Sequence, residues 1–152
     1  MQNKPSDPSE WTLENYRHPD QFGNWLGYKI ISIDREKFVS EVSLQIRDDH
    51  LSPARRVHGG VNSSLFDFTC GAAVFSTLAP RDYGSTVELK INYLQPIELG
   101  DLLRARGEVI FRGKRLCVVQ AFAYRNDEKQ PVAMATSTFN VVAGKVSPIP
   151  PT

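Results

Sequence analysis

The sequence lacks an excess of charge of either sign, because its 18 lysines and arginines are matched by 17 aspartates and glutamates. A basic surface is typical of proteins that bind nucleic acid or an anionic membrane, so the balance argues against both partners. An anionic ligand would have to be held by a local group of basic side chains.

Long apolar runs are also missing, and no stretch approaches the roughly 18 consecutive apolar residues of a membrane-spanning helix. The first residues, MQNKPSDPSEW, do not combine a basic start with an apolar run as a secretory signal does. Cysteine is scarce, and neither Cys70 nor Cys117 has the spacing of zinc ligands or of a disulfide framework. We therefore expect a soluble cytoplasmic protein without a metal site or a cofactor.

One long helix is predicted, from Val61 to about Leu78, and Pro80 ends it. Segments with the alternation of strands lie on both sides of it: WLGYKIISI and KFVSEVSLQI before, and STVELKINY, LLRARGEVIF, RLCVVQAFAY and PVAMATSTFNVV after. A single helix among antiparallel strands indicates an α+β fold in which the sheet wraps around the helix. The folded domain is expected over residues 25–143, after an arm or short helix at 1–24 and before a flexible tail at 144–152.

Three further details concern the strands. Regular alternation in STVELKINY places Val87 and Leu89 on one face and Thr86 and Glu88 on the other. The link at Gly113-Lys114 has the composition of a two-residue hairpin turn. Small residues recur on one face of the last two strands and leave space for the helix: Cys117, Ala121, Ala123, Ala133 and Ala135.

Gly59-Gly60 directly precedes the predicted helix. The first turn of a helix presents unpaired backbone N–H groups and the positive end of the dipole. Without side chains, a ligand carbonyl can approach these donors closely, which is the geometry of an oxyanion hole. A tight loop that only leads into the helix is the simpler interpretation of the same two glycines.

Asp67 is the one acid in an otherwise apolar helix, between Phe66 and Phe68. A carboxylate buried there would be costly unless it were paired or used. Its neighbours three and four residues away are small and would form a slot around it: Ser63, Ser64, Cys70 and Gly71. The slot could receive a substrate or a partner subunit, and an ion pair across an interface remains the alternative role for Asp67.

His58-Gly59-Gly60, followed nine residues after the histidine by Asp67, resembles the signature of hotdog-fold acyl-CoA thioesterases of the phenylacetate-degradation type. The phrase GSTVELKINYLQPIELGD resembles the third strand of that family and the loop after it. The similarity extends from about residue 25 to residue 143. It implies the hotdog fold, an acyl-CoA substrate, and a homodimer or dimer of dimers with each active site at the dimer interface.

The resemblance also assigns roles to residues. It implies that Asp67 acts as nucleophile or as general base for water, and that the Gly60 amide polarises the thioester carbonyl. Thr86 matches a hydroxyl residue that orients water, and His58 matches a histidine that more often fixes the loop than acts as a base. Ser52 stands where several relatives carry an asparagine or glutamine, which is a departure from the family pattern.

Two further groups of residues are expected to contact the substrate. Gly59, Ser63 and Ser64 would line the site, and the basic hairpin of Arg112, Lys114 and Arg115 could hold the phosphates of coenzyme A. Solvated surface is the simpler role for that hairpin.

Two other functions fit a fold of this kind. A hotdog-fold hydratase or dehydratase is one, but DDHLSPARRVH lacks the Asp-x-Asn-Pro-x-His arrangement of such hydratases. A non-catalytic acyl-CoA-binding module is the other, although it would have no need for the helix acid. A Cys70–His58 nucleophilic pair is disfavoured, because Cys70 lies in an apolar segment.

Overall fold

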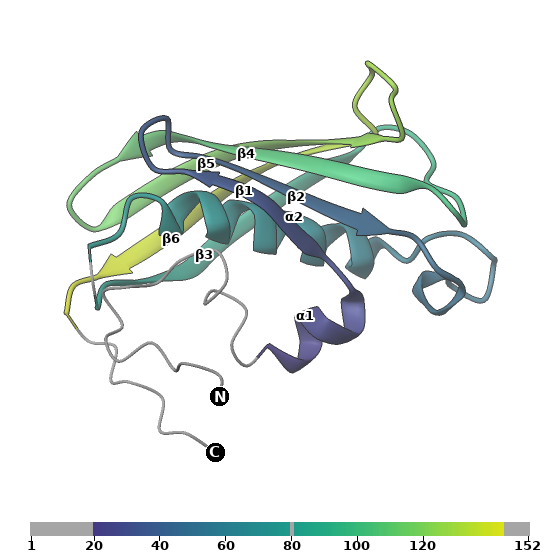
Figure 1. Ribbon diagram of the computed structural model, residues 1–152, viewed down its shortest axis with the longest axis horizontal. Helices are drawn as coiled ribbons and strands as arrows, with labels where there is room; N and C mark the ends of the chain where they lie inside the picture. The colour runs from purple at the N-terminus through teal and green to yellow at the C-terminus, as the bar shows by residue number, and fades with distance from the viewer. Residues whose placement is uncertain (1–19, 80, 145–152) are drawn as a thin grey trace, which may run out of the picture.

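The computed structural model describes residues 20–79 and 81–144, which form a six-stranded antiparallel sheet packed against one long helix (Figure 1). This is the α+β hotdog arrangement that the sequence predicts. The strands lie in the order β1-β2-β4-β5-β6-β3. Their bounds are β1 Lys29–Asp34, β2 Val39–Gln45, β3 Tyr83–Tyr93, β4 Leu102–Arg112, β5 Leu116–Arg125 and β6 Ala133–Val142, and the helices are α1 Gln21–Leu26 and α2 Gly59–Phe75.

Helix α2 lies across the concave side of the sheet, as the small residues of the last strands predict (Figure 1). Those residues are all buried: Cys117, Ala121, Ala123, Ala133 and Ala135. The approach is close at β4, where a Cβ added to Gly107 would lie 3.2 Å from the carbonyl oxygen of Thr69. The same carbonyl accepts a hydrogen bond of 2.7 Å from Ser40 Oγ, which links α2 to β2.

Regular alternation in β3 was the wrong expectation, because the strand contains a β-bulge. Thr86 pairs with Phe139 and Glu88 pairs with Thr138, so Val87 is an extra residue and its side chain is 64% exposed. The bulge puts Thr86 on the face that points toward α2, together with Leu89. Regular alternation would place Thr86 and Leu89 on opposite faces.

Three other local expectations also need correction. The first strand begins at Lys29 rather than Trp25, because Trp25 and Leu26 belong to α1. The β4–β5 link spans residues 113–115 and is closed by the Gly113 amide, which donates to Leu116 O at 2.8 Å, without a positive φ at Gly113. Helix α2 begins two residues earlier than expected and ends at Phe75. The expected 1–24 arm and 144–152 tail lie almost wholly outside the described residues.

Helix α1 is held in place by the loop that leads to α2. His50, only 1% exposed, donates from Nε2 to Leu26 O at 3.0 Å and accepts at Nδ1 from the Arg47 amide at 3.2 Å. The Arg47 guanidinium donates to Leu26 O at 3.0 Å and also to Trp25 O. Both nitrogens of the His50 ring are therefore used in its neutral form.

This burial makes the stability of the protein depend on pH. Burial lowers the pKa of His50 below the usual 6.5, so below that pH the unfolded chain binds a proton that the folded chain excludes. The stabilisation is present above pH 6.5 and is lost as the pH falls below it. We expect the melting temperature to fall less between pH 7 and pH 5.5 in His50→Gln than in the wild type. An equal fall in both proteins would contradict this role of His50.

Candidate active site

The start of α2 is capped by His58. Its Nδ1 accepts a hydrogen bond of 3.1 Å from the Gly60 amide, and its carbonyl accepts one of 2.9 Å from the Val61 amide. The imidazole thus fixes the loop, as the resemblance implied, and it occupies the amide that was expected to polarise a carbonyl. The neighbouring Gly59 amide donates to no group among residues 20–79 and 81–144.

Asp67 and Thr86 come together although they are 19 residues apart in the chain. Thr86 Oγ1 donates a hydrogen bond of 2.9 Å to Asp67 Oδ1. The β3 bulge makes this contact possible, because it turns Thr86 toward the helix. A hydroxyl that donates to one oxygen of a carboxylate fixes the carboxylate and leaves its other oxygen free to accept a proton.

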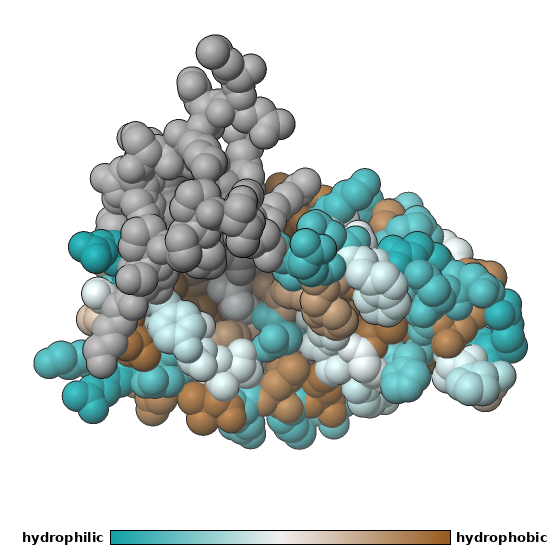
Figure 2. Space-filling model, turned by 90° about the horizontal axis from the view of Figure 1, so that it is seen from below, coloured by the Kyte–Doolittle hydropathy of each residue, from teal (hydrophilic) through white to brown (hydrophobic). Residues whose placement is uncertain are grey.

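Asp67 is exposed in the single chain, so the expectation of a buried carboxylate is wrong for this chain alone. The carboxylate lies in a depression of about 330 Å³ on the side of the molecule that carries α1 and α2. Figure 2 views that side, where apolar and polar side chains are interspersed. The depression is lined by Asp20, Phe22, Ser63, Ser64, Asp67, Phe68 and Leu89.

The expected slot of small residues is only partly present. Ser63 and Ser64 line it, and both hydroxyls donate back to Gly60 O, at 3.1 Å and 2.7 Å. Cys70 does not, because its side chain is fully buried in the core. Burial, with a smaller contribution from the charge of Asp67, raises the pKa of the Cys70 thiol to about 12, which excludes a thiolate nucleophile at neutral pH.

One chain does not bring the carboxylate to the amides at the start of α2. Asp67 follows Gly60 by seven residues, which is about 10 Å along a helix. A reacting carbonyl must lie about 3 Å from both its attacking group and its hydrogen-bond donors. A complete site of this kind therefore needs a second source for either the carboxylate or the amide donors.

Four further expected contributors lie apart from these groups. Ser52 forms a backbone turn with Arg56, and it lines neither the Asp67 depression nor the pockets at the start of α2. Arg112 donates from Nε to Thr77 Oγ1, two residues after the end of α2, at 3.0 Å and also to Gly113 O. Lys114 and Arg115 are exposed at that end, about 25 Å from Gly60 by the length of the helix.

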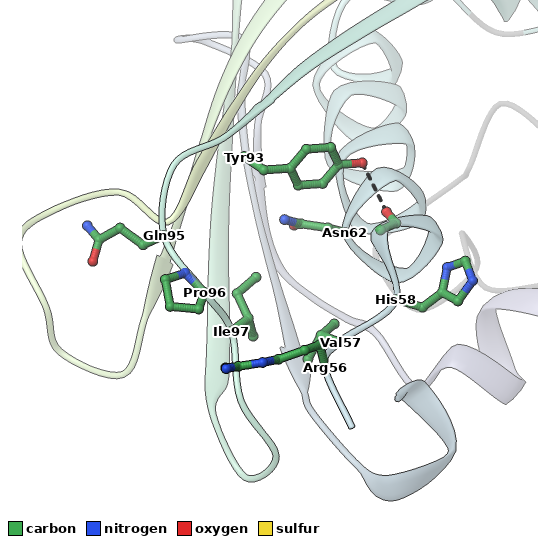
Figure 3. A pocket seen from close by; sticks show the side chains of 9 residues that line it. Arg56, Val57, His58, Asn62, Tyr93, Gln95, Pro96 and Ile97 are labelled. Carbon is green, nitrogen blue, oxygen red and sulfur yellow. Dashed lines mark hydrogen bonds between the residues drawn. The ribbon is translucent and has the colours of Figure 1, made fainter. Parts of the chain in front are cut away.

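A second pocket, of about 380 Å³, lies between the start of α2 and the segment that follows β3 (Figure 3). Tyr93 Oη donates to Gly59 O at 3.2 Å across it. Asn62 is 2% exposed there, and its Oδ1 has no hydrogen-bond partner among the described residues. Asn62 was not among the residues expected to form the site, although an amide at a core position of an apolar helix was a signal that could have found it.

The described residues contain no group of three or more histidine, cysteine, aspartate or glutamate side chains arranged to hold a metal ion. No helix among them is long and apolar enough to cross a membrane.

Comparison with known proteins gives consistent matches. Residues 54–132 match the family model described as the thioesterase superfamily. A relative from Saccharolobus solfataricus, named "Putative esterase", is 26% identical over 140 residues, which cover 92% of this chain and 96% of that protein.

Solved structures match as well. A phenylacetic acid degradation-related protein from Ralstonia eutropha is 28% identical with a TM-score of 0.75, covering 84% of this chain and 95% of that one. A Streptococcus mutans protein, solved bound to acetyl-CoA, is 30% identical with a TM-score of 0.68, covering 76% and 88%.

Proposed function

Because the chain belongs to the thioesterase superfamily, we propose that it hydrolyses acyl thioesters of coenzyme A to the free acid and the thiol. The observation that carries this proposal is the hydrogen bond of 2.9 Å from Thr86 to Asp67, which orients a carboxylate in an open depression beside α2. A relative solved with acetyl-CoA supports coenzyme A as the thiol.

In the proposed reaction, Asp67 supplies the base or the nucleophile. As a base it takes a proton from water, and the hydroxide attacks the thioester carbon; as a nucleophile it forms an anhydride that water then cleaves. In both routes the carbon–sulfur bond breaks. The leaving thiolate takes back the proton held by Asp67 in the base route, and it takes one from the water that cleaves the anhydride in the nucleophile route. The negative charge that develops on the carbonyl oxygen is stabilised by amide hydrogens at the start of α2.

The donors to that oxygen are proposed to be Gly60 and its neighbour Gly59. The Gly60 amide already donates to His58 Nδ1 at 3.1 Å, so a substrate oxygen there shares or replaces the imidazole. The Gly59 amide is open. His58 then acts by positioning the glycine loop rather than by moving a proton.

We propose that two copies of the chain share each active site, because Asp67 and Gly60 are about 10 Å apart along one helix. A carbonyl bound at the start of α2 in one copy would meet the carboxylate of the second copy. In a homodimer or a dimer of dimers the exposed hairpin residues Lys114 and Arg115 could reach the phosphates of a substrate bound to the partner. Arg112 already donates to Thr77 and Gly113, so a phosphate there would have to share its guanidinium.

The proposed activity is tested with a panel of short, medium, long and aromatic acyl-CoAs, with release of free thiol as the readout. We expect turnover of at least one class by the purified protein. Binding of acyl-CoA without release of thiol would overturn hydrolysis and favour the non-catalytic binding module. Loss or gain of water across an enoyl or hydroxyacyl group would favour the hydratase or dehydratase.

Thr86 is expected to act through Asp67. Thr86→Val keeps the shape of the side chain and removes the hydroxyl that donates to the carboxylate. A hydrogen bond to a charged group is worth about 1.5–3 kcal/mol, so we expect kcat to fall about 10- to 100-fold with little change in KM. Thr138→Val, on β6, is the matched control. Equal kcat values in the Thr86 variant and the wild type would contradict the positioning role.

A further inference from the structure

The second pocket at the start of α2 lies on a different side of the helix from Asp67. Asn62 and Asp67 are five residues apart, which turns their side chains about 140° from one another around the helix axis. The pocket is formed with the end of β3 and the residues that follow it. It is therefore separate from the depression that holds the carboxylate.

Asn62 is the polar side chain of this pocket that lacks a partner. It is 2% exposed, and its Oδ1 accepts no hydrogen bond within residues 20–79 and 81–144. An unsatisfied buried acceptor is destabilising, and a leucine at this position would avoid the cost. A polar group retained at such a cost points to a ligand that donates a hydrogen bond to it.

The surroundings of Asn62 narrow the choice of ligand. Figure 3 shows its side chain pointing toward Gln95 and Pro96, away from His58. Gln95 Nε2 already donates to Pro131 O at 3.1 Å, and Tyr93 Oη donates to Gly59 O. Apolar side chains make up much of the remaining lining: Val57, Pro96 and Ile97.

Arg56 adds a positive charge to the lining of the same pocket. Among the described residues it forms one ion pair, a long one of 3.6 Å with Glu98, and both side chains are about two-thirds exposed. Such exposed pairs contribute little, so the guanidinium is available to an anion. The pocket thus combines a buried acceptor, an apolar wall and a cation.

We propose that this pocket takes the pantetheine arm of coenzyme A, and that Asn62 Oδ1 accepts a hydrogen bond from the arm's amide nearest the thioester sulfur. This inference rests on the proposed function. The arm's amide, its methylene groups and the phosphates beyond them match the acceptor, the wall and the cation. A volume of about 380 Å³ lies within the range of small-molecule sites.

The spacing agrees with this arrangement. Four bonds separate the thioester carbon from the arm's first amide nitrogen, a span of about 5 Å. Asn62 follows Gly59 by three residues, or about 4.5 Å along the helix. A thioester with its carbonyl at the start of α2 can therefore place this amide beside Asn62. Every coenzyme A thioester carries the amide, whereas an acyl group need not carry any donor.

The test uses two thioesters of one acyl group that the wild type hydrolyses. One has N-acetylcysteamine as its thiol, which contains the amide, and the other has pentanethiol, which replaces the amide with methylene groups. We expect kcat/KM of the wild type to favour the amide-bearing ester about tenfold or more. Asn62→Leu should remove this preference, while Asn140→Leu, on β6, should keep it.

Other outcomes overturn the inference. An unchanged preference in Asn62→Leu would show that Asn62 does not bind the arm. If Asn62→Leu changed only the ratio between hydroxylated and plain acyl groups, the pocket would belong to the acyl group instead. Asn62→Ala serves for the same comparison if the leucine variant does not fold.

Calorimetric titration with free coenzyme A separates this inference from the proposed function. We expect the Kd to rise about tenfold in Asn62→Leu and to stay unchanged in Asn140→Leu. Failure of the wild type to hydrolyse any thioester, together with this rise in Kd, would overturn only the hydrolysis. An unchanged Kd in a protein that hydrolyses acyl-CoA would overturn only the role of Asn62.

Discussion

Asp67→Asn is expected to lower thioester turnover by about 10²- to 10⁴-fold, the contribution of a positioned acid–base group. The amide keeps the size of the side chain and an oxygen that can accept from Thr86, but it can neither take a proton from water nor attack a carbonyl. Because Asp67 is exposed in the single chain, folding should be preserved. The measurements are kcat and the melting temperature of the same preparation.

The alternative role for Asp67, an ion pair across an interface, gives the opposite result. Removing one side of a buried pair costs about 3–5 kcal/mol, so assembly or stability would fall instead of the rate. Asp127→Asn, at an exposed residue between β5 and β6, controls for the loss of one charge. Near-normal turnover per folded Asp67→Asn molecule would contradict the catalytic role of Asp67.

Mixing two inactive variants is expected to restore activity if the site is shared between copies. Gly60→Pro removes the amide hydrogen at the start of α2, where proline is tolerated, and should lower kcat about 10²- to 10³-fold. A mixed dimer of Gly60→Pro with Asp67→Asn contains one site built from two intact halves. Random pairing should therefore recover about a quarter of the wild-type activity.

The controls are each variant alone and the two mixed without exchange of subunits, which should all stay at the low rate. A site contained in one chain predicts no recovery after exchange, because every chain then carries a defect. Full activity in Gly60→Pro alone would instead show that the Gly60 amide does not stabilise the oxyanion. Analytical ultracentrifugation of the mixture checks that mixed dimers have formed.

The order of the strands and the long helix along the chain was predictable, because hydrophobic periodicity is a local property of the sequence. The alanines and Cys117 on the inner face of β5 and β6 even predicted where α2 lies. The bulge at Val87 was not predictable, because the residues on both sides of it fit regular alternation equally well. Only the pairing of β3 with β6 reveals the extra residue.

Only part of the candidate site was predictable. The resemblance drew attention to Asp67 and Thr86, and the structure brings them to 2.9 Å. It did not indicate that the Gly60 amide is already bonded to His58, since capping depends on the rotamer of one side chain. Asn62 was missed because burial, rather than residue type, makes its unpaired oxygen significant.

The bulge in β3 has a consequence for how this strand can change. Each residue added to or removed from a strand exchanges its two faces from that point on. If β3 ran regularly through Val87, Thr86 and Leu89 would be three residues apart and would point to opposite faces, so the hydroxyl would leave Asp67 for the outer surface. Deleting Val87 would remove the extra residue, and Thr86 and Leu89, then two residues apart, would share the inner face without a bulge. The count of residues between Thr86 and Leu89, together with the bulge that absorbs one of them, therefore decides whether the hydroxyl meets Asp67.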